Sequence, residues 1–244
     1  AAGYSAVTYD ESQLYFAGTI AAGASSDILL TSYLPAGSLN TLFGESTDNS
    51  VVKLDLGGED KTVAIVSDDS NLFVVANSEI NNAGEVCIAK LDNTGALDTT
   101  VGTNASGIYC TNENSQLTAT SAVMTSEDIY IVGYKQSSNK DSFWLKLDDN
   151  LAVQGSGIIY TDVGSNNLDD AAMTIYNYDS DKFMLAGYVT DIAGDKDAYI
   201  RYVDKDGLNE TSFNSGQPVV IDIAGGDDVI VAQTGESDGG FKAF

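Results

Sequence analysis

The chain has 244 residues, of which 43% are hydrophobic and 9% aromatic, and this composition excludes a disordered polypeptide. Its 36 acidic and 11 basic residues give a formal net charge of -25, which excludes nucleic acid and anionic lipid as partners because both are bound through their phosphates. No apolar run reaches the ~18 residues of a membrane-spanning helix, so no membrane insertion is expected. Such acidity is typical of a secreted or cell-surface protein that needs solubility, or of a surface that binds divalent cations or a cationic partner.

Short apolar runs bounded by Gly, Asn, Asp and Ser recur along the chain and predict β-strands. In chain order the clearest are "LYFAGT" from Leu14, "ILLTSYL" from Ile28, "TVAIVS" from Thr62, "LFVVAN" from Leu72, "VCIAKL" from Val86, "SGIYCT" from Ser106, "IYIVGY" from Ile129, "FWLKL" from Phe143, "FMLAGY" from Phe183 and "AYIRYV" from Ala198. No segment has a helical apolar period of useful length, so the predicted class is all-β.

One of these runs is copied at a nearly fixed interval. Its copies begin at Leu14, Leu72, Ile129 and Phe183, with spacings of 58, 57 and 54 residues, and "FKAF" from Phe241 continues the series at 58. A fixed spacing marks a copied structural unit. We therefore predict a β-propeller of four-stranded antiparallel blades, built as one repeat domain over residues 1–244. The repeats are residues 1–58, 59–116, 117–169 and 170–227, with a partial fifth repeat at 228–244.

A second recurring peptide follows the third strand of each repeat. It reads "AGSLNTLFG" from Ala36, "TGALDTTVG" from Thr94 and "DGLNETSFNSG" from Asp206, whereas "DDNLAVQGSG" from Asp148 replaces this turn in the third repeat. Together with "VVKLDLGGEDK" and "AIVSDDSNLFVVAN", these turns resemble the Delta-60 repeat of bacterial secreted and surface proteins over essentially the whole chain. The resemblance implies a propeller-like fold and an exported or surface location, and it implies no catalytic residues.

The two cysteines fall on strands that are expected to be neighbours. Cys87 lies on the third strand of the second repeat and Cys110 on the fourth. An exported protein would allow a disulfide between them if their Cα atoms lie within ~7 Å. The alternative is a pair of buried free thiols that pack as small hydrophobic side chains.

Histidine is absent, which removes the commonest general base and the commonest zinc ligand. No cofactor is expected. Calcium is the one candidate metal, because "VDKDGLNE" offers the oxygen ligands Asp204, Asp206 and Glu210. The alternative for the same residues is a hairpin turn. A further acidic group in "DIAGDKDAY" consists of Asp191, Asp195 and Asp197.

Paired carboxylates can hydrolyse glycosides at the right separation. The pairs at 169–170 and 227–228 recur with a spacing of 58 residues, so we expect them to belong to the repeat and not to one active centre. Trp144, the single tryptophan, follows Phe143 on a predicted strand. Core packing is expected for it in preference to a platform for a sugar ring.

The leading functional prediction is a non-enzymatic, exported or cell-surface scaffold for recognition or structural assembly, with loops on one face binding an unidentified protein or glycan. One alternative is an extracellular glycan-acting enzyme that uses carboxylates. Another is a subunit of a surface assembly, joined through its incomplete fifth blade. An open strand edge invites pairing with another chain, so self-association is expected at "GGFKAF", residues 239–244.

Overall fold

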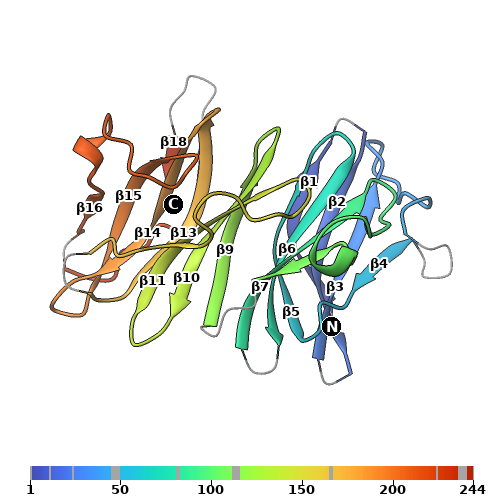
Figure 1. The fold of residues 1–244 in the computed structure, drawn as a ribbon, viewed down its shortest axis with the longest axis horizontal. Coiled ribbons are helices and arrows are strands. Elements are labelled where there is room, and N and C mark those ends of the chain that lie inside the picture. Colours follow the sequence, from blue (N-terminus) through green and yellow to red (C-terminus); the bar gives the residue numbers. More distant parts are fainter. Residues whose placement is uncertain are drawn as a thin grey trace. The chain divides into compact units, whose positions relative to one another are not determined.

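The computed structural model describes residues 2–10, 12–23, 25–44, 50–80, 83–111, 116–164, 167–223, 225–235 and 241–243. Strands dominate these residues, and the only helical elements among them are the short 3-10 turns Thr103–Ala105 and Asn214–Gly216. Within the described ranges no helix has the length and apolarity to cross a membrane. The predicted all-β class is confirmed (Figure 1).

The chain divides into two compact units, and unit 1 comprises Ala1–Ala119 with Asp149–Ala152. Two antiparallel meanders fill it. The first contains β1 (Ala2–Tyr9), β2 (Leu14–Ala22), β3 (Ser25–Tyr33) and β4 (Val51–Leu54), and the second contains β5 (Glu59–Ser67), β6 (Asn71–Ile80), β7 (Ala83–Asp92) and β8 (Ile108–Cys110). A single parallel pair, Ser26 with Glu59, joins the two meanders into one eight-stranded sheet.

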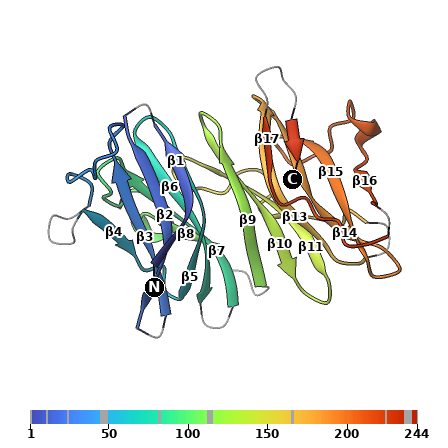
Figure 2. The ribbon, with the colours of Figure 1, turned by 180° about the vertical axis from the view of Figure 1, so that it is seen from behind.

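Unit 2 comprises Thr120–Asp148 and Val153–Phe244. One of its four-stranded sheets contains β9 (Gln116–Met124, whose first four residues belong to unit 1), β10 (Asp128–Gln136), β11 (Lys140–Asp148) and β12 (Ile159–Thr161). The other contains β13 (Asp170–Asp179), β14 (Lys182–Thr190), β15 (Lys196–Asp204) and β16 (Val219–Ile221). A final pair, β17 (Gln233–Gly235) and β18 (Phe241–Ala243), follows (Figure 2). Each predicted full repeat thus corresponds to one meander.

The second strand of each later meander is buried along most of its length. At least five consecutive residues are buried in each of β6, β10 and β14. A sheet with one solvent-exposed face would instead alternate buried and exposed residues along each strand. Runs of consecutive buried residues arise where both faces of a sheet are covered. The uninterrupted apolar sequences "LFVVA" and "FMLAGYV" satisfy that requirement, because side chains on both faces of the strand enter a core.

The turn after the third strand is present in every repeat, including the third. Its closing pairs are Tyr33–Leu39, Leu91–Leu97, Leu147–Val153 and Val203–Asn209. Four residues beyond the first member of each pair the backbone has a positive φ, at Gly37 (82°), Gly95 (88°), Leu151 (60°) and Gly207 (75°). The sequence suggested loss of the turn in the third repeat, and this is corrected. Leu151 adopts the left-handed conformation in place of glycine, and its side chain is buried.

Candidate functional site

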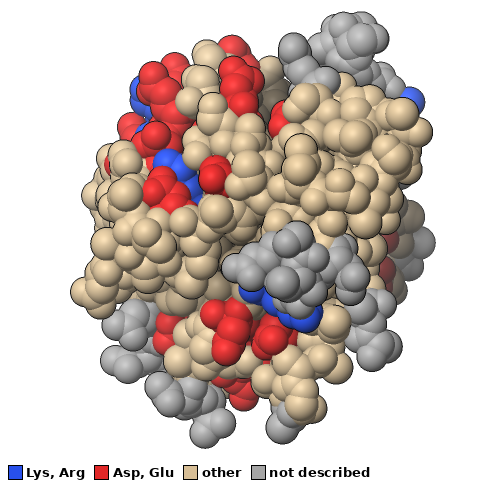
Figure 3. Space-filling view, turned by 90° about the vertical axis from the view of Figure 1, so that its right-hand side faces the viewer, with Lys and Arg blue, Asp and Glu red and all other residues tan. Residues whose placement is uncertain are grey.

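Acidic side chains form two groups on the face shown in Figure 3, with neutral side chains between them.

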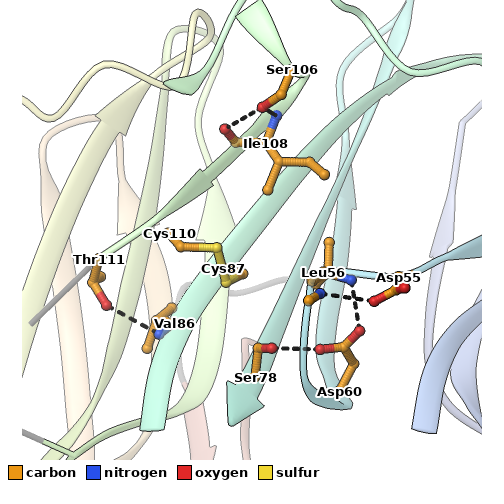
Figure 4. Close-up of a disulfide and its surroundings, with 11 residues drawn as sticks. Asp55, Leu56, Asp60, Ser78, Val86, Cys87, Ser106, Ile108, Cys110 and Thr111 are labelled. Carbon is orange, nitrogen blue, oxygen red and sulfur yellow. Dashed lines mark hydrogen bonds between the residues drawn. A yellow bond between two sulfur atoms is a disulfide. The ribbon is translucent and has the colours of Figure 1, made fainter. Parts of the chain in front are cut away.

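One buried carboxylate of unit 1 holds a loop in place. The carboxylate of Asp60 accepts hydrogen bonds from the Leu56 N–H at 2.8 Å and the Ser78 hydroxyl at 2.5 Å (Figure 4). Burial raises its pKa, and the charges of Asp55 and Asp27 act in the same direction. Because both oxygens of Asp60 bond within the protein, its primary role is to fix the connection between β4 and β5.

Asp170 has the corresponding place in unit 2, at the start of β13. It is fully buried and accepts hydrogen bonds from the Ser142 N–H at 2.9 Å, the Ser142 hydroxyl, and the Val163 N–H at 3.1 Å. Burial raises the pKa of this carboxyl to about 6, and the charge of Asp162 adds to the effect. Since no surface of Asp170 is exposed, it joins β13 to the preceding meander and does not reach a substrate.

The neighbouring acids are also part of the repeat. Asp169 accepts the Lys140 N–H at 2.9 Å and Asp227 accepts the Lys196 N–H at 3.1 Å, so each fixes the first residue of a third strand. Asp228 accepts the Ile223 N–H at 2.7 Å. These contacts agree with the expectation that the pairs 169–170 and 227–228 belong to the scaffold.

A group of partly exposed carboxylates surrounds Asp197 near the start of β15. Partial burial raises the pKa of Asp197, and the negative charges of Asp222, Asp191, Asp228 and Asp195 raise it further. When two carboxylates lie close together, the negative charge of one favours the protonated form of the other and so raises its pKa. Asp197 therefore holds its proton to a higher pH than an isolated aspartate.

Most of these neighbours use their carboxylates to fix loops. Asp191 accepts the N–H groups of Ala193 at 2.8 Å and Asp195 at 3.0 Å, and Asp222 accepts the Gly225 N–H at 3.0 Å. For Asp197 no such hydrogen bond occurs among the described residues. The cluster thus combines one protonatable carboxyl that is free of a turn with several acids held in place by the backbone. The sequence drew attention to Asp191, Asp195 and Asp197 but did not bring Asp222 and Asp228 to them.

The residues predicted to bind calcium are engaged in their own turn. Asp204 accepts the N–H groups of Asp206 and Leu208, both at 2.9 Å. Glu210 accepts the Ser212 N–H at 3.2 Å and lies 3.4 Å from the Lys182 ammonium, and these contacts lower its pKa. These contacts are those of the hairpin turn that was the alternative in the sequence, and calcium binding by these residues stays a prediction. Among the described residues, close groups of three ligand-bearing side chains are Asp27 with Asp55 and Asp60, and Glu85 with the two cysteines.

The two cysteines form a disulfide. Cys87 on β7 faces Cys110 on β8, with an S–S distance of 2.06 Å and a Cα–Cα distance of 4.2 Å (Figure 4). Beside it the Thr111 hydroxyl accepts the Val86 N–H at 3.2 Å. The short strand β8 is therefore held to β7 by a covalent bond as well as by its ladder.

Trp144 lies in the core of unit 2, as expected from the sequence. It is 4% exposed, and its ring centroid lies 5.2 Å from that of Tyr130 and 5.3 Å from that of Phe183. With 4% of its surface exposed, the indole offers no face on which a sugar could stack. Phe143, its neighbour along β11, is also buried.

No family model matches the sequence, and no curated protein matches it significantly. Among solved structures the chain is similar to the subtype N11 neuraminidase-like protein of A/flat-faced bat/Peru/033/2010 (H18N11), with a TM-score of 0.51 and 12% identity over 90% of this chain and 56% of that chain. It is also similar to the catalytic domain of a Coprinopsis cinerea GH62 alpha-L-arabinofuranosidase (TM-score 0.44, 11% identity, 85% and 68% covered). A thermostable family-43 glycoside hydrolase matches with a TM-score of 0.41 at 11% identity, with 98% and 76% covered.

The fold is propeller-like. The similarity to the neuraminidase-like protein shows this, although the chain spans 56% of that protein's length. The prediction that the chain is not an enzyme is wrong. It took tandem repetition as the mark of a non-enzymatic scaffold, but the fold that the chain shares with the neuraminidase-like protein is not restricted to such scaffolds. A repeated scaffold does not exclude catalysis, because a reactive group needs only one position at which the repeats differ.

Proposed function

We propose that the chain is a glycan-acting hydrolase in which Asp197 donates a proton to the glycosidic oxygen. The raised pKa of a partly exposed carboxyl among other carboxylates is the observation that carries this proposal. Glycoside hydrolysis uses one protonated carboxyl and one ionised carboxylate, and an environment that separates their pKa values assigns the two roles.

Asp222 is the proposed ionised partner. Its charge has the largest effect of any neighbouring acid on Asp197, its side chain is exposed, and the Gly225 N–H holds it in position. Asp197 would give its proton to the leaving oxygen as the bond to the anomeric carbon breaks. Asp222 would take a proton from the attacking water, whose oxygen forms the new bond to that carbon.

The proposed substrate class is supported by the fold. The solved structure that shares it most fully among those described above is named neuraminidase-like, which favours a glycan over a peptide or nucleotide substrate. The net charge of -25 agrees with a substrate that lacks phosphate groups. A panel of glycoside substrates would identify the particular sugar that is hydrolysed.

The test is hydrolysis of fluorogenic aryl glycosides by the wild-type chain and by two variants. Asp197→Asn is expected to lower kcat by about 10²- to 10⁴-fold, the usual contribution of a general acid. Asp69→Asn, which changes an exposed acid in the turn between β5 and β6, serves as the matched control and is expected to retain wild-type kcat. Equal activity of Asp197→Asn and the control, or no turnover of any substrate by the wild-type chain, would overturn the proposal.

The repeats are proposed to be blades of one propeller related to the Delta-60 family. In support, Ile230, just before β17, and Gln233, the first residue of β17, bind β14. The Ile230 N–H donates to the Gly187 oxygen at 3.4 Å, and the Gln233 side-chain amide donates to the Met184 oxygen at 2.9 Å. The partial fifth repeat thus starts beside β14 of the fourth repeat. Self-association through residues 239–244 also stays a prediction, since 239, 240 and 244 lie outside the described residues. Light scattering that showed a monomer at all concentrations would contradict it.

A further inference from the structure

Trp144 carries a buried hydrogen-bond donor without a partner. Its indole Nε1 has no hydrogen bond within the described part of the chain, although the residue is only 4% exposed. Buried N–H groups in folded proteins are nearly always paired, because an unpaired one has lost its water without replacement. An indole nitrogen can only donate, so the missing partner is an acceptor.

Trp144 also lines a small pocket. The pocket has a volume of about 110 Å³, and Trp144, Lys146, Ser156, Lys205 and Asp206 contribute to its lining. A β-carbon placed on Gly207 would lie 2.9 Å from Trp144 Cδ1, the atom bonded to Nε1. The edge of the indole that bears the N–H therefore lies beneath the turn that carries Lys205 and Asp206. All of these residues belong to unit 2.

Two of the 11 basic residues line this one pocket in a chain whose net charge is -25. Lys146 lies 3.0 Å from Asp128, and Lys205 lies 3.5 Å from Asp181 at a site where both side chains are about half exposed. An exposed pair of that kind is weak, so the Lys205 ammonium can turn to a ligand at little cost. The residues that line this pocket thus carry the indole N–H and two ammonium groups, of which that of Lys146 is paired with Asp128.

The volume and the lining limit the chemistry of the ligand. Liquid water takes about 30 Å³ per molecule, so the pocket holds a group of roughly three or four heavy atoms. A carboxylate has that size and accepts several charge-assisted hydrogen bonds at once. Gln154, Ser156 and Asp206 also line the pocket and supply donors and an acceptor of the kind that hydroxyl groups use.

We propose that the Trp144 pocket binds an acidic sugar residue, with its carboxylate on Trp144 Nε1 and the lysines and its hydroxyls on the polar rim. The pocket lies beyond the carboxyl end of β15, whereas Asp197 lies near the amino end of the same strand. At a rise of ~3.3 Å per residue these ends are about 25 Å apart. The pocket is thus a separate binding site that holds the glycan away from the reacting bond.

This inference shares with the proposed function only the glycan as ligand class. Binding is measured without turnover, so failure of hydrolysis at Asp197 leaves it standing, and failure of binding leaves the hydrolase proposal standing. The single tryptophan gives one indole N–H resonance in an NMR spectrum, which reports directly on this pocket. Glucuronate is the probe, and glucose is the neutral sugar of matched shape. Both are titrated at about 0.15 M salt, where the field of distant charges is screened within ~8 Å.

The expected result is a saturable shift of the indole N–H resonance with glucuronate and none with glucose. Lys205→Gln should weaken glucuronate binding about tenfold through loss of a charge-assisted hydrogen bond. Lys182→Gln, which removes a similarly exposed lysine paired with Glu210 outside the pocket, should bind as the wild type does. Melting temperatures of both variants verify that they fold.

Three outcomes would overturn the inference. They are the absence of any shift up to the solubility limit of glucuronate, equal shifts with glucose and glucuronate, and equal affinities of the two lysine variants. Trp144→Phe, which keeps an aromatic ring and removes the N–H, gives a second measurement by calorimetry. It should lose binding of glucuronate, and retention of wild-type affinity would also refute the role of the indole donor.

Discussion

The buried carboxyl of Asp170 is expected to make the stability of the chain depend on pH in an unusual direction. Burial raises its pKa from 3.8 to about 6 in the folded protein. The folded state therefore keeps a proton on Asp170 between about pH 4 and pH 6, where the unfolded chain has released it. Over that interval the folded state binds more protons, so the free energy of unfolding falls as pH rises. The loss is complete above about pH 6.

The size of the effect follows from the difference in pKa. About two units at 1.36 kcal/mol each correspond to about 3 kcal/mol, and no correction for solvent screening applies because Asp170 is fully buried. Asp170→Asn removes the titration but retains the shape of the side chain. The free energy of unfolding of this variant, relative to the wild type, should rise by about 3 kcal/mol from about pH 4 to about pH 7.

Urea denaturation followed by the fluorescence of Trp144 measures this difference at each pH. Asp162→Asn is the matched control, because Asp162 is an exposed neighbour whose charge is a minor cause of the Asp170 shift. The free energy of unfolding of Asp162→Asn, relative to the wild type, should change little between about pH 4 and about pH 7. If the difference between Asp170→Asn and the wild type stays constant across the range, Asp170 titrates as it does in the unfolded chain and the reasoning is refuted.

Two further predictions concern the scaffold. Reduction of the disulfide between Cys87 and Cys110, or Cys110→Ser, should lower the free energy of unfolding by about 3 kcal/mol for a loop of 23 residues, measured by urea denaturation with and without reductant; an unchanged midpoint would contradict it. Gly37→Ala and Gly207→Ala both place a side chain at positive φ, which costs about 1 kcal/mol. Only at Gly207 does the new β-carbon contact Trp144. Thermal melting should therefore show that Gly207→Ala destabilises the protein by about 1–2 kcal/mol more than Gly37→Ala does. Equal effects of the two substitutions would show that the indole moves aside.

The repetition of the fold was readable in the sequence because the apolar runs from Leu72, Ile129 and Phe183 must be buried on both faces wherever they occur. The same repeat pattern placed Cys87 and Cys110 on neighbouring strands, the third and fourth of the second repeat. The turn at Leu151 was missed, because the sequence rule asks for glycine at a positive φ and the structure places a buried leucine there.

The chemistry of the carboxylates was less accessible. Asp170 receives two of its three hydrogen bonds from Ser142, 28 residues away, so neither its burial nor its raised pKa is visible in the local sequence. Asp197 and Asp222 come together only when β15 pairs with β16. A signal was present nonetheless, since an acid recurs before three of the four inter-repeat connections, at Asp55, Asp162 and Asp222.

The single parallel pair between Ser26 and Glu59 has a mechanical consequence for unit 1. Within each meander the strands share long ladders, whereas the strands of the first meander pair with those of the second at this one position among the described residues. The two meanders are therefore held together mainly by the core that they share, to which Leu30 and Leu72 both belong. Substitutions that weaken this core should loosen the meanders from each other and leave the ladders within each of them intact.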